Sequence, residues 1–453
     1  MHSFLLAMAL ASSLAQPAEP PAPAAGRAQM AGPAIDIGPQ MGHVGTDRAR
    51  IWARAAGPGP LRLWLLDADA DAPRSVDAAA DLERDCCVVF DVADLRSARV
   101  YRFALGEHAP PRDDPAGWPH SFRTAPDPAS PARVSLAFGS CCKDKPGEPL
   151  PIFDTIASHA PDALVLIGDT PYIDSTDLAV QRRRYREFLS NPQMAALRAS
   201  TATYATWDDH DFGRNDTDGR LKGRENARRA FVEYHANAGA DGRGESSEDG
   251  ENGEGIYSKF RLGPVEVFLI DARWFSRTET SPVDPQKLTL LGAMQWEWLK
   301  RELRASTATF KVLATGMIWN ESVRPLKTDY WGAYPHERAA VWKFIADEQI
   351  DGVVLMGGDI HRSRLLRHAP EFTGAPYPLY EFISSPLSHN VHANANVPHP
   401  SLVWDVGDPS VFLLLEADST GSPAMLTGCW INAAGEELHR VAVRADEIRC
   451  PIR

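Results

Sequence analysis

The sequence predicts an α/β protein in which a small all-β sandwich domain precedes a layered α/β domain. Residues 34–125 contain short β-prone runs separated by turn residues, with little helical periodicity. From residue 132 onward, strand-like runs alternate with helical ones, which is the pattern of a layered α/β domain. Several of these later runs end in carboxylate, imidazole, phenol or thiol side chains, and strand ends are where open α/β sheets place their sites.

Composition divides the chain into three segments. We expect a leader with an Ala- and Pro-rich tether at 1–33, the β-sandwich domain at 34–125 and the α/β domain at 132–453, with a linker near 124–128. The strands expected in the first domain are 49–54, 61–66, 87–90 and 100–105. The strands expected in the second are 134–138, 163–167, 203–206, 265–270, 310–315 and 352–356, followed by more antiparallel ones at 380–383, 411–415 and 425–431. The helices expected are 152–159, 177–200, 224–235 and 287–304, and 241–255 is expected to be a surface insertion.

Charge and the N-terminus limit the possible partners and location. The chain has 47 basic and 60 acidic residues, a net charge of −13, which argues against a broad nucleic-acid-binding face. The apolar stretch 5–14 ends within Ser13-Leu14-Ala15, which stands before Gln16, resembles a signal-peptide cleavage site and predicts export to the periplasm or medium. The alternative is a disordered apolar leader. No later stretch has the roughly 18 uninterrupted apolar residues of a membrane-spanning helix.

Four motifs follow strand-like runs and are rich in metal-ligand side chains. They are Ser140-Cys141, Gly168-Asp169-Thr170-Pro171-Tyr172, the segment 207–211 with Asn215-Asp216, and Gly357-Gly358-Asp359-Ile360-His361. Because strand ends of such sheets converge, these side chains are expected to meet. Together they predict one polynuclear metal centre.

Asp169 is a carboxylate that could bridge two cations. Gly168 allows the backbone to turn sharply after the strand, so that the carboxylate projects over the sheet edge. Tyr172, three residues later, is close enough to reach the same ion. A Gly-Asp pair alone is more often a turn or a helix N-cap, so the prediction depends on the other motifs.

The run Asp208-Asp209-His210-Asp211 follows a β-prone run and Trp207, which argues against a fully solvated acidic turn. Burying these groups together is unfavourable unless cations neutralise them. Asn215 adds an amide oxygen, which suits a hard cation such as calcium.

Two further motifs supply a carboxylate, an imidazole and a thiol. Asp359 and His361 stand two residues apart, so in extended chain they would share a face. Cys141 is either a half-buried small apolar residue, a disulfide partner or a thiolate ligand of iron or zinc. The six cysteines are compatible with disulfides, but their pairing cannot be inferred.

In this order the motifs resemble those of the alkaline phosphatase D family, metal-dependent phosphoesterases also called PhoD-like phosphatases. The resemblance covers most of the chain, because Ile37-Gly38-Pro39-Gln40 and 50–54 are similar to that family's leading β-domain. It implies a layered α/β-β/α, metallophosphoesterase-like catalytic domain. It also implies ferric iron, Fe(3+), and calcium, Ca(2+), as cofactors. The implied iron ligands are Cys141, Tyr172, Asp169 and His361, with Cys142 as an alternative thiolate; the implied calcium ligands are Asp169, Asp208 or Asp209, Asn215 and Asp359.

The activity implied is hydrolysis of a small phosphate mono- or diester by a metal-activated water. His210 is the candidate to protonate the leaving oxygen or orient the phosphate, and Arg214 either contacts a phosphate oxygen or is a surface residue. Two alternatives remain open. One is a covalent nucleophile, Thr170 or Ser140, although no Gly-x-Ser-x-Gly elbow is present; the other is a non-catalytic metal-binding protein. The leaving group and the oligomeric state stay open, and a monomer is compatible with the sequence.

Overall fold

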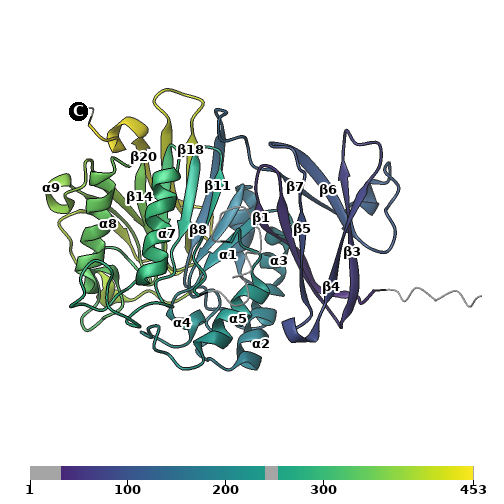
Figure 1. Cartoon of the computed structure of the whole chain (residues 1–453), viewed down its shortest axis with the longest axis horizontal. Helices are drawn as coiled ribbons and strands as arrows, with labels where there is room; N and C mark the ends of the chain where they lie inside the picture. Colours follow the sequence, from purple (N-terminus) through teal and green to yellow (C-terminus); the bar gives the residue numbers. More distant parts are fainter. Residues whose placement is uncertain (1–31, 240–253, 452–453) are drawn as a thin grey trace, which may run out of the picture. The chain divides into compact units, whose positions relative to one another are not determined.

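A computed structural model describes residues 32–239 and 254–451 (Figure 1). The expected leader, most of the tether and nearly all of the 241–255 insertion lie outside these residues. The first part of the described chain forms two antiparallel sheets, with strand orders β1-β2-β5 and β4-β3-β6-β7. Their strands are β1 Ile35–Val44, β2 Ala49–Ala55, β3 Gly59–Asp67, β4 Arg74–Ala80, β5 Cys87–Val92, β6 Val100–Leu105 and β7 His120–Arg123. Both sheets contribute to one apolar core, as predicted for an all-β N-terminal region.

Two larger sheets follow, and each contains a parallel set of strands. The strand orders are β10-β9-β8-β18-β19-β20 and β11-β12-β13-β14-β16-β15-β17. Strands β8 to β10 are parallel in the first sheet, and β12, β13, β14 and β16 are parallel in the second. The first sheet has β8 Arg133–Gly139, β9 Ala163–Ile167, β10 Ala202–Thr206, β18 Val411–Asp418, β19 Met425–Asn432 and β20 Glu437–Arg444. The second has β11 Ser258–Leu262, β12 Val265–Leu269, β13 Phe310–Ala314, β14 Val353–Gly357, β15 Ser363–His368, β16 Leu379–Ile383 and β17 Leu402–Val406.

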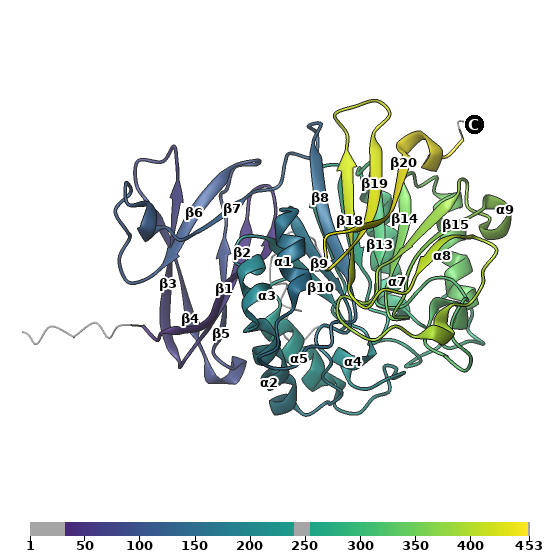
Figure 2. The same ribbon diagram turned by 180° about the vertical axis from the view of Figure 1, so that it is seen from behind.

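The two larger sheets pack face to face between helices (Figures 1 and 2). Leu136 and Phe138 of β8 point into a core shared with β12, β13 and β14, whereas Ala137 points into a second core with α1, α2 and α3. Strand alternation thus gives each sheet one face toward the other sheet and one toward helices. The helices are α1 Pro151–Ser158, α2 Leu178–Leu189, α3 Pro192–Arg198, α4 Asp209–Phe212, α5 Arg224–Tyr234, α7 Gly292–Ala305, α8 Pro335–Asp347 and α9 Pro370–Thr373. This is the predicted α/β-β/α layering.

Strand β1 lies against edge strand β10 of the first large sheet. The hydroxyl of Tyr204 accepts a hydrogen bond from the backbone N–H of Val44 at 3.1 Å, and the indole N–H of Trp52 donates to the carbonyl of Glu233 at 2.8 Å. The side-chain amide of Asn237 accepts the backbone N–H of Ala205 on β10 at 3.0 Å and donates to the carbonyl of Ala205 at 2.7 Å, which pairs backbone groups of this edge strand. The two parts belong to one compact unit, and the division at 125–132 stays a prediction.

Two expected helices differ from those observed. The single helix expected at 177–200 is two helices, because Pro192 cannot continue α2 and Asn191 caps α3 by accepting the backbone N–H of Met194. Helix α7 begins at Gly292, five residues after the expected start at Lys287, because the carboxylate of Glu337 accepts the backbone N–H groups of Leu290 and Leu291. Helix α8 was not predicted.

All six cysteines lie within the described ranges and none forms a disulfide, so their even number has no structural meaning here. Among the helices of the described residues, none combines the length and apolar character needed to span a bilayer.

Candidate metal centre and active site

The candidate site forms where strands of both large sheets end. Cys141 follows β8, Asp169 follows β9, Asp208 follows β10 and Asp359 follows β14. Three of these residues leave their strands through left-handed backbone conformations: φ is 56° at Cys141, 54° at Asp169 and 67° at Asp359. Such conformations are uncommon for residues other than glycine and concentrate at functional sites.

The turn after β9 requires glycine, as the sequence predicted. Gly168 has φ of 99°, and a Cβ at this position would lie 2.5 Å from the Cβ of Asp208. Neither the conformation nor the space admits a side chain. The absence of a side chain therefore lets the ends of β9 and β10 approach each other, which brings Asp169 and Asp208 into one cluster.

Asp359 and His361 do not form the extended chain that their spacing suggested. Both residues have left-handed backbones, with φ of 67° and 51°, and the segment bends instead of continuing β14. Both side chains still line the same pocket. The expectation of a shared strand face was wrong, because tertiary contacts beyond the strand end decide this turn, including a hydrogen bond from the His361 backbone N–H to the hydroxyl of Ser385 at 3.1 Å.

A thiol, a carboxylate, a phenol and an imidazole meet at the buried end of the pocket. The thiol of Cys141 lies 3.5 Å from a carboxylate oxygen of Asp169, and the hydroxyl of Tyr172 lies 2.9 Å from Nε2 of His361. His361 Nδ1 is 2.8 Å from the carbonyl of Asn390, so Nδ1 carries the proton and Nε2 presents its lone pair. Cys142 instead packs into the apolar core, so the structure brings Cys141 to the site.

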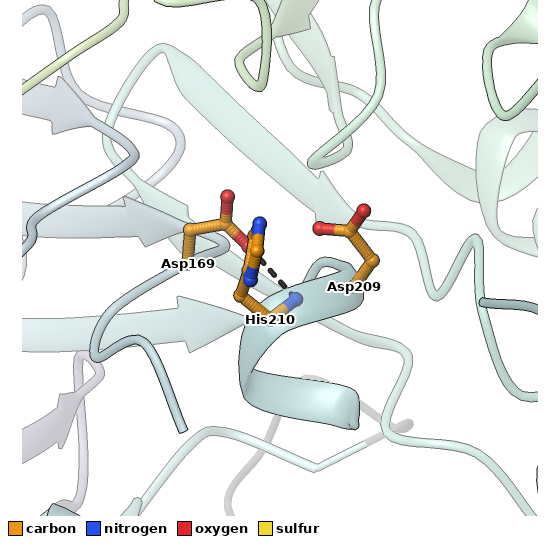
Figure 3. A group of neighbouring side chains, drawn as sticks. All are labelled: Asp169, Asp209 and His210. Carbon is orange, nitrogen blue, oxygen red and sulfur yellow. Dashed lines mark hydrogen bonds between the residues drawn. The ribbon is translucent and has the colours of Figure 1, made fainter. Parts of the chain in front are cut away.

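Several carboxylate oxygens of the site accept no hydrogen bond from the described residues, and they include Oδ2 of Asp208 and Oδ1 of Asp209. Asp209 and His210 stand at the start of α4, and the His210 backbone N–H donates to Asp169 at 3.1 Å (Figure 3). Three sets of ligand atoms lie within 4.8 Å of one another: Asp169 with Asp209 and His210, Asp208 with Asp209 and Asp359, and Asp209 with Asp216 and Asp329. Buried carboxylate oxygens without partners are costly, so these sets fit cations.

Electrostatics support the same conclusion. Burial, followed by repulsion from Asp209 and Asp208, raises the pKa of Asp169 well above its usual range. Burial also raises the pKa of Asp359 to about 6, although Lys327 opposes this shift. Burial and the neighbouring His389 and His392 lower the pKa of His361 to about 3, which keeps the imidazole neutral and able to bind a cation.

His210 forms an acid–base pair with Asp174. Its Nδ1 lies 2.6 Å from a carboxylate oxygen of Asp174. Burial acts to lower the pKa of His210, but the hydrogen bond to Asp174 and the charge of Asp209 outweigh it and raise the pKa above its ordinary value. The contact with Asp174 therefore favours the protonated form of the imidazole.

A pocket of about 230 Å³ gives access to this cluster. The sequence-predicted residues that line it are Asp169, Tyr172, His210, Asn215, Asp359 and His361. Cys141, Asp208 and Asp209 are buried behind this surface. Arg214 is exposed and does not line this pocket.

Sequence reasoning missed several charged residues of the site. Arg273 is fully buried and donates from Nε to Asp208 at 2.6 Å and from Nη2 to Asp329 at 3.0 Å. It follows the end of β12, so the strand-end rule applied to that strand could have identified it. Lys327 lies in a loop with no comparable signal. The other missed residues are Lys143, Asp174, Arg324, Asp329, His389 and His392.

The chain is similar in sequence to known phosphatases. A family model described as PhoD-like phosphatase matches residues 136–403. Alkaline phosphatase D of Bacillus subtilis (strain 168) is 26% identical, over 72% of this chain and 64% of that protein, so the chain spans less than two thirds of this relative's length.

Solved structures share the fold at low sequence identity. A structure of PhoD has a TM-score of 0.67 and 19% identity, with 88% of this chain and 91% of that chain covered. A purple acid phosphatase from yellow lupin (Lupinus luteus) seeds has a TM-score of 0.68 and 11% identity, with 93% and 77% covered. Both likenesses support the layered α/β-β/α architecture.

Proposed function

Because the chain belongs to the PhoD-like phosphatase family, we propose that it hydrolyses small phosphate esters with a metal-activated water. One observation carries this proposal. Buried thiol, imidazole and carboxylate groups and a half-buried phenol converge from four strand ends on one site, and one oxygen each of Asp208 and Asp209 accepts no hydrogen bond from described residues. Such a donor set suits metal ions and has no use in an ordinary apolar core.

The ligands fall into two overlapping sets. Cys141, Tyr172, Asp169 and His361 would hold Fe(3+), since thiolate, phenolate and imidazole are ligands that iron accepts. Asp169, Asp208 or Asp209, Asn215 and Asp359 would hold Ca(2+), which prefers oxygen ligands. Bound ions would generate hydroxide near neutral pH and neutralise charge on the phosphate.

The chain itself supplies proton transfer and positioning. His210 lines the pocket, and Asp174 holds its Nδ1 proton. The Nε2 proton is then available for the leaving oxygen as its bond to phosphorus breaks. Asp174 is a positioning residue, because its carboxylate fixes the ring and favours the protonated form.

A covalent mechanism through Ser140 or Thr170 fits less well. The hydroxyl of Ser140 donates to the carbonyl of Ser384 at 2.9 Å. Ser140 is 1% exposed and Thr170 is 2% exposed. Neither lines the pocket. A nucleophile must reach the phosphorus, so direct attack by water is the better proposal. Inversion at an isotopically labelled phosphorus would support it, and retention would contradict it.

The test is turnover of a chromogenic phosphate monoester and diester by metal-free and metal-loaded protein. We expect chelation to abolish activity and iron with calcium to restore it. Asp169→Asn should lose on the order of 100-fold, while Asp113→Asn, an exposed aspartate of the β-sandwich region, should match wild type. Full activity of the metal-stripped protein, or equal activity of the two variants, would refute the proposal. A protein that binds metal but turns over no ester would instead support the non-catalytic alternative.

We also propose export. The support is the apolar stretch 5–14 followed by a small-residue site. N-terminal sequencing of the protein from its native host should show removal of the leader near residue 15; an intact N-terminus in the cytoplasm would contradict this.

A further inference from the structure

Lys327 lies inside the carboxylate cluster. Its side chain is 3% exposed, and its ammonium lies 2.9 Å from Asp359, 2.9 Å from Asp329 and 3.4 Å from Asp216. An ammonium group has three hydrogens. The ammonium donates hydrogen bonds to Asp216 and Asp359 and forms an ion pair with Asp329, so three carboxylates surround it.

Arg273 neutralises the adjoining side of the same cluster. Its guanidinium bonds Asp208 at 2.6 Å and Asp329 at 3.0 Å and donates a further hydrogen bond to the carbonyl of Thr217 at 2.9 Å. Asp329 is thus held by both Lys327 and Arg273. A buried carboxylate with such partners is stabilised in its charged form without a metal ion.

These contacts divide the cluster into two regions. In one, Asp209, Asp216 and Asp329 could together hold a cation, but Lys327 already bonds two of the three. In the other, Asp169 receives the thiol of Cys141 and the backbone N–H of His210. Within residues 32–239 and 254–451, no lysine or arginine forms an ion pair with Asp169.

We propose that Lys327 is a resident cation that takes the place of a divalent ion between Asp216, Asp329 and Asp359. This inference rests on the proposed function, because it concerns the same metal centre. The ammonium is a compact point charge at hydrogen-bonding distance from oxygens that a calcium ion would bind. Since it is covalently part of the chain, it cannot be lost to a chelator. Metal ions are then limited to the sets in which Asp209 joins Asp169 or Asp208, and the chain binds one divalent ion fewer than its carboxylates could support.

The experiment replaces the ammonium with an uncharged side chain of similar length. Lys327→Met should bind about one more calcium ion per chain than wild type, because the freed carboxylate oxygens favour a divalent ion. The count is made by equilibrium dialysis with radioactive calcium and by elemental analysis. Lys311→Met is the matched control, because Lys311 is also buried but its ammonium donates to the carbonyls of Ala308 and Asp351. An unchanged calcium count in folded Lys327→Met would overturn the proposal.

Folding is followed in the same samples by circular dichroism. A Lys327→Met protein that folds only when calcium is added supports the proposal, because the ion then replaces the missing charge. A protein that stays unfolded at millimolar calcium overturns it. Lys327→Gln, which retains a hydrogen-bonding head, should also gain the ion, and an unchanged count in this variant likewise overturns the proposal.

Wild-type measurements keep this inference separate from the proposed function. If the wild type is active and binds metal, and its calcium count equals that of Lys327→Met, the proposal for Lys327 is refuted and the proposed function stands. If the wild type turns over no ester with any metal added, the proposed function is refuted. An additional calcium ion bound by the variant would still show that Lys327 occupies a cation position.

Discussion

Acid should weaken the contact between β1 and β10 through a single histidine. His43 is 2% exposed, and its Nδ1 lies 3.2 Å from the hydroxyl of Tyr204 on β10. Burial, followed by the positive charges of Arg50 and Arg48, lowers the pKa of His43 to about 3. The ring therefore stays neutral in the folded protein until the pH falls to about 3.

The magnitude follows from linkage between folding and protonation. In the unfolded chain the histidine pKa is about 6.5, so between pH 6.5 and 3 the unfolded state binds more protons than the folded state. Stability is complete above pH 6.5 and is lost as the pH falls toward 3. At pH 5 the loss from this residue is about 2 kcal/mol, given about 1.36 kcal/mol per pKa unit.

The assay is urea unfolding followed by tryptophan fluorescence at pH 8 and pH 5, with chelator present so that metal binding does not contribute. His43→Gln keeps a hydrogen-bonding group for Tyr204 but does not titrate. Wild type should lose about 2 kcal/mol more than His43→Gln between the two pH values. His108→Gln, an exposed histidine of the β-sandwich region, should behave like wild type. Equal losses in wild type and His43→Gln would refute the reasoning.

Three further predictions concern the site. Iron-loaded protein should absorb visible light because phenolate and thiolate donate charge to ferric iron; the band should change in both Tyr172→Phe and Cys141→Ser, and an unchanged band in both would remove them as ligands. Asp174→Asn should lower the pKa of His210, so the pH at which kcat falls on the alkaline side should move to a lower value. An unchanged pH profile of kcat would show that His210 is not the general acid. Gly168→Ala should cost at least about 1–3 kcal/mol in urea unfolding, because its Cβ would lie 2.5 Å from another side chain; a stability equal to wild type would show that the turn relaxes freely.

The residues that stand at the strand ends could be identified from the amino-acid sequence alone. Strands β9 and β14 are continuous apolar runs and β8 is a mostly apolar one, so the glycine and polar residues that follow mark where each strand ends. The Gly168-Asp169 turn was predictable for the same local reason, because glycine has a conformational freedom that no other residue has. The order of the motifs along the chain was enough to predict the family.

Tertiary structure decided what these residues contact. Cys141 and Cys142 are adjacent and chemically identical, and only the left-handed backbone at Cys141 directs one toward Asp169 and the other into the core. The break in the helix expected at 177–200 was also not predicted from the sequence, because residues on both sides of Pro192 are good helix formers.

The ion pairs of the site join residues that are far apart in the sequence. Lys327 is separated from Asp216 by 111 positions and from Asp359 by 32, and Arg273 is 65 positions from Asp208. A lone lysine in a loop carries no periodicity or spacing that would mark it as buried. Its place among three carboxylates arises because both sheets and the loop after β13 meet at one point, where burial makes each unpaired charge costly and each pair stabilising.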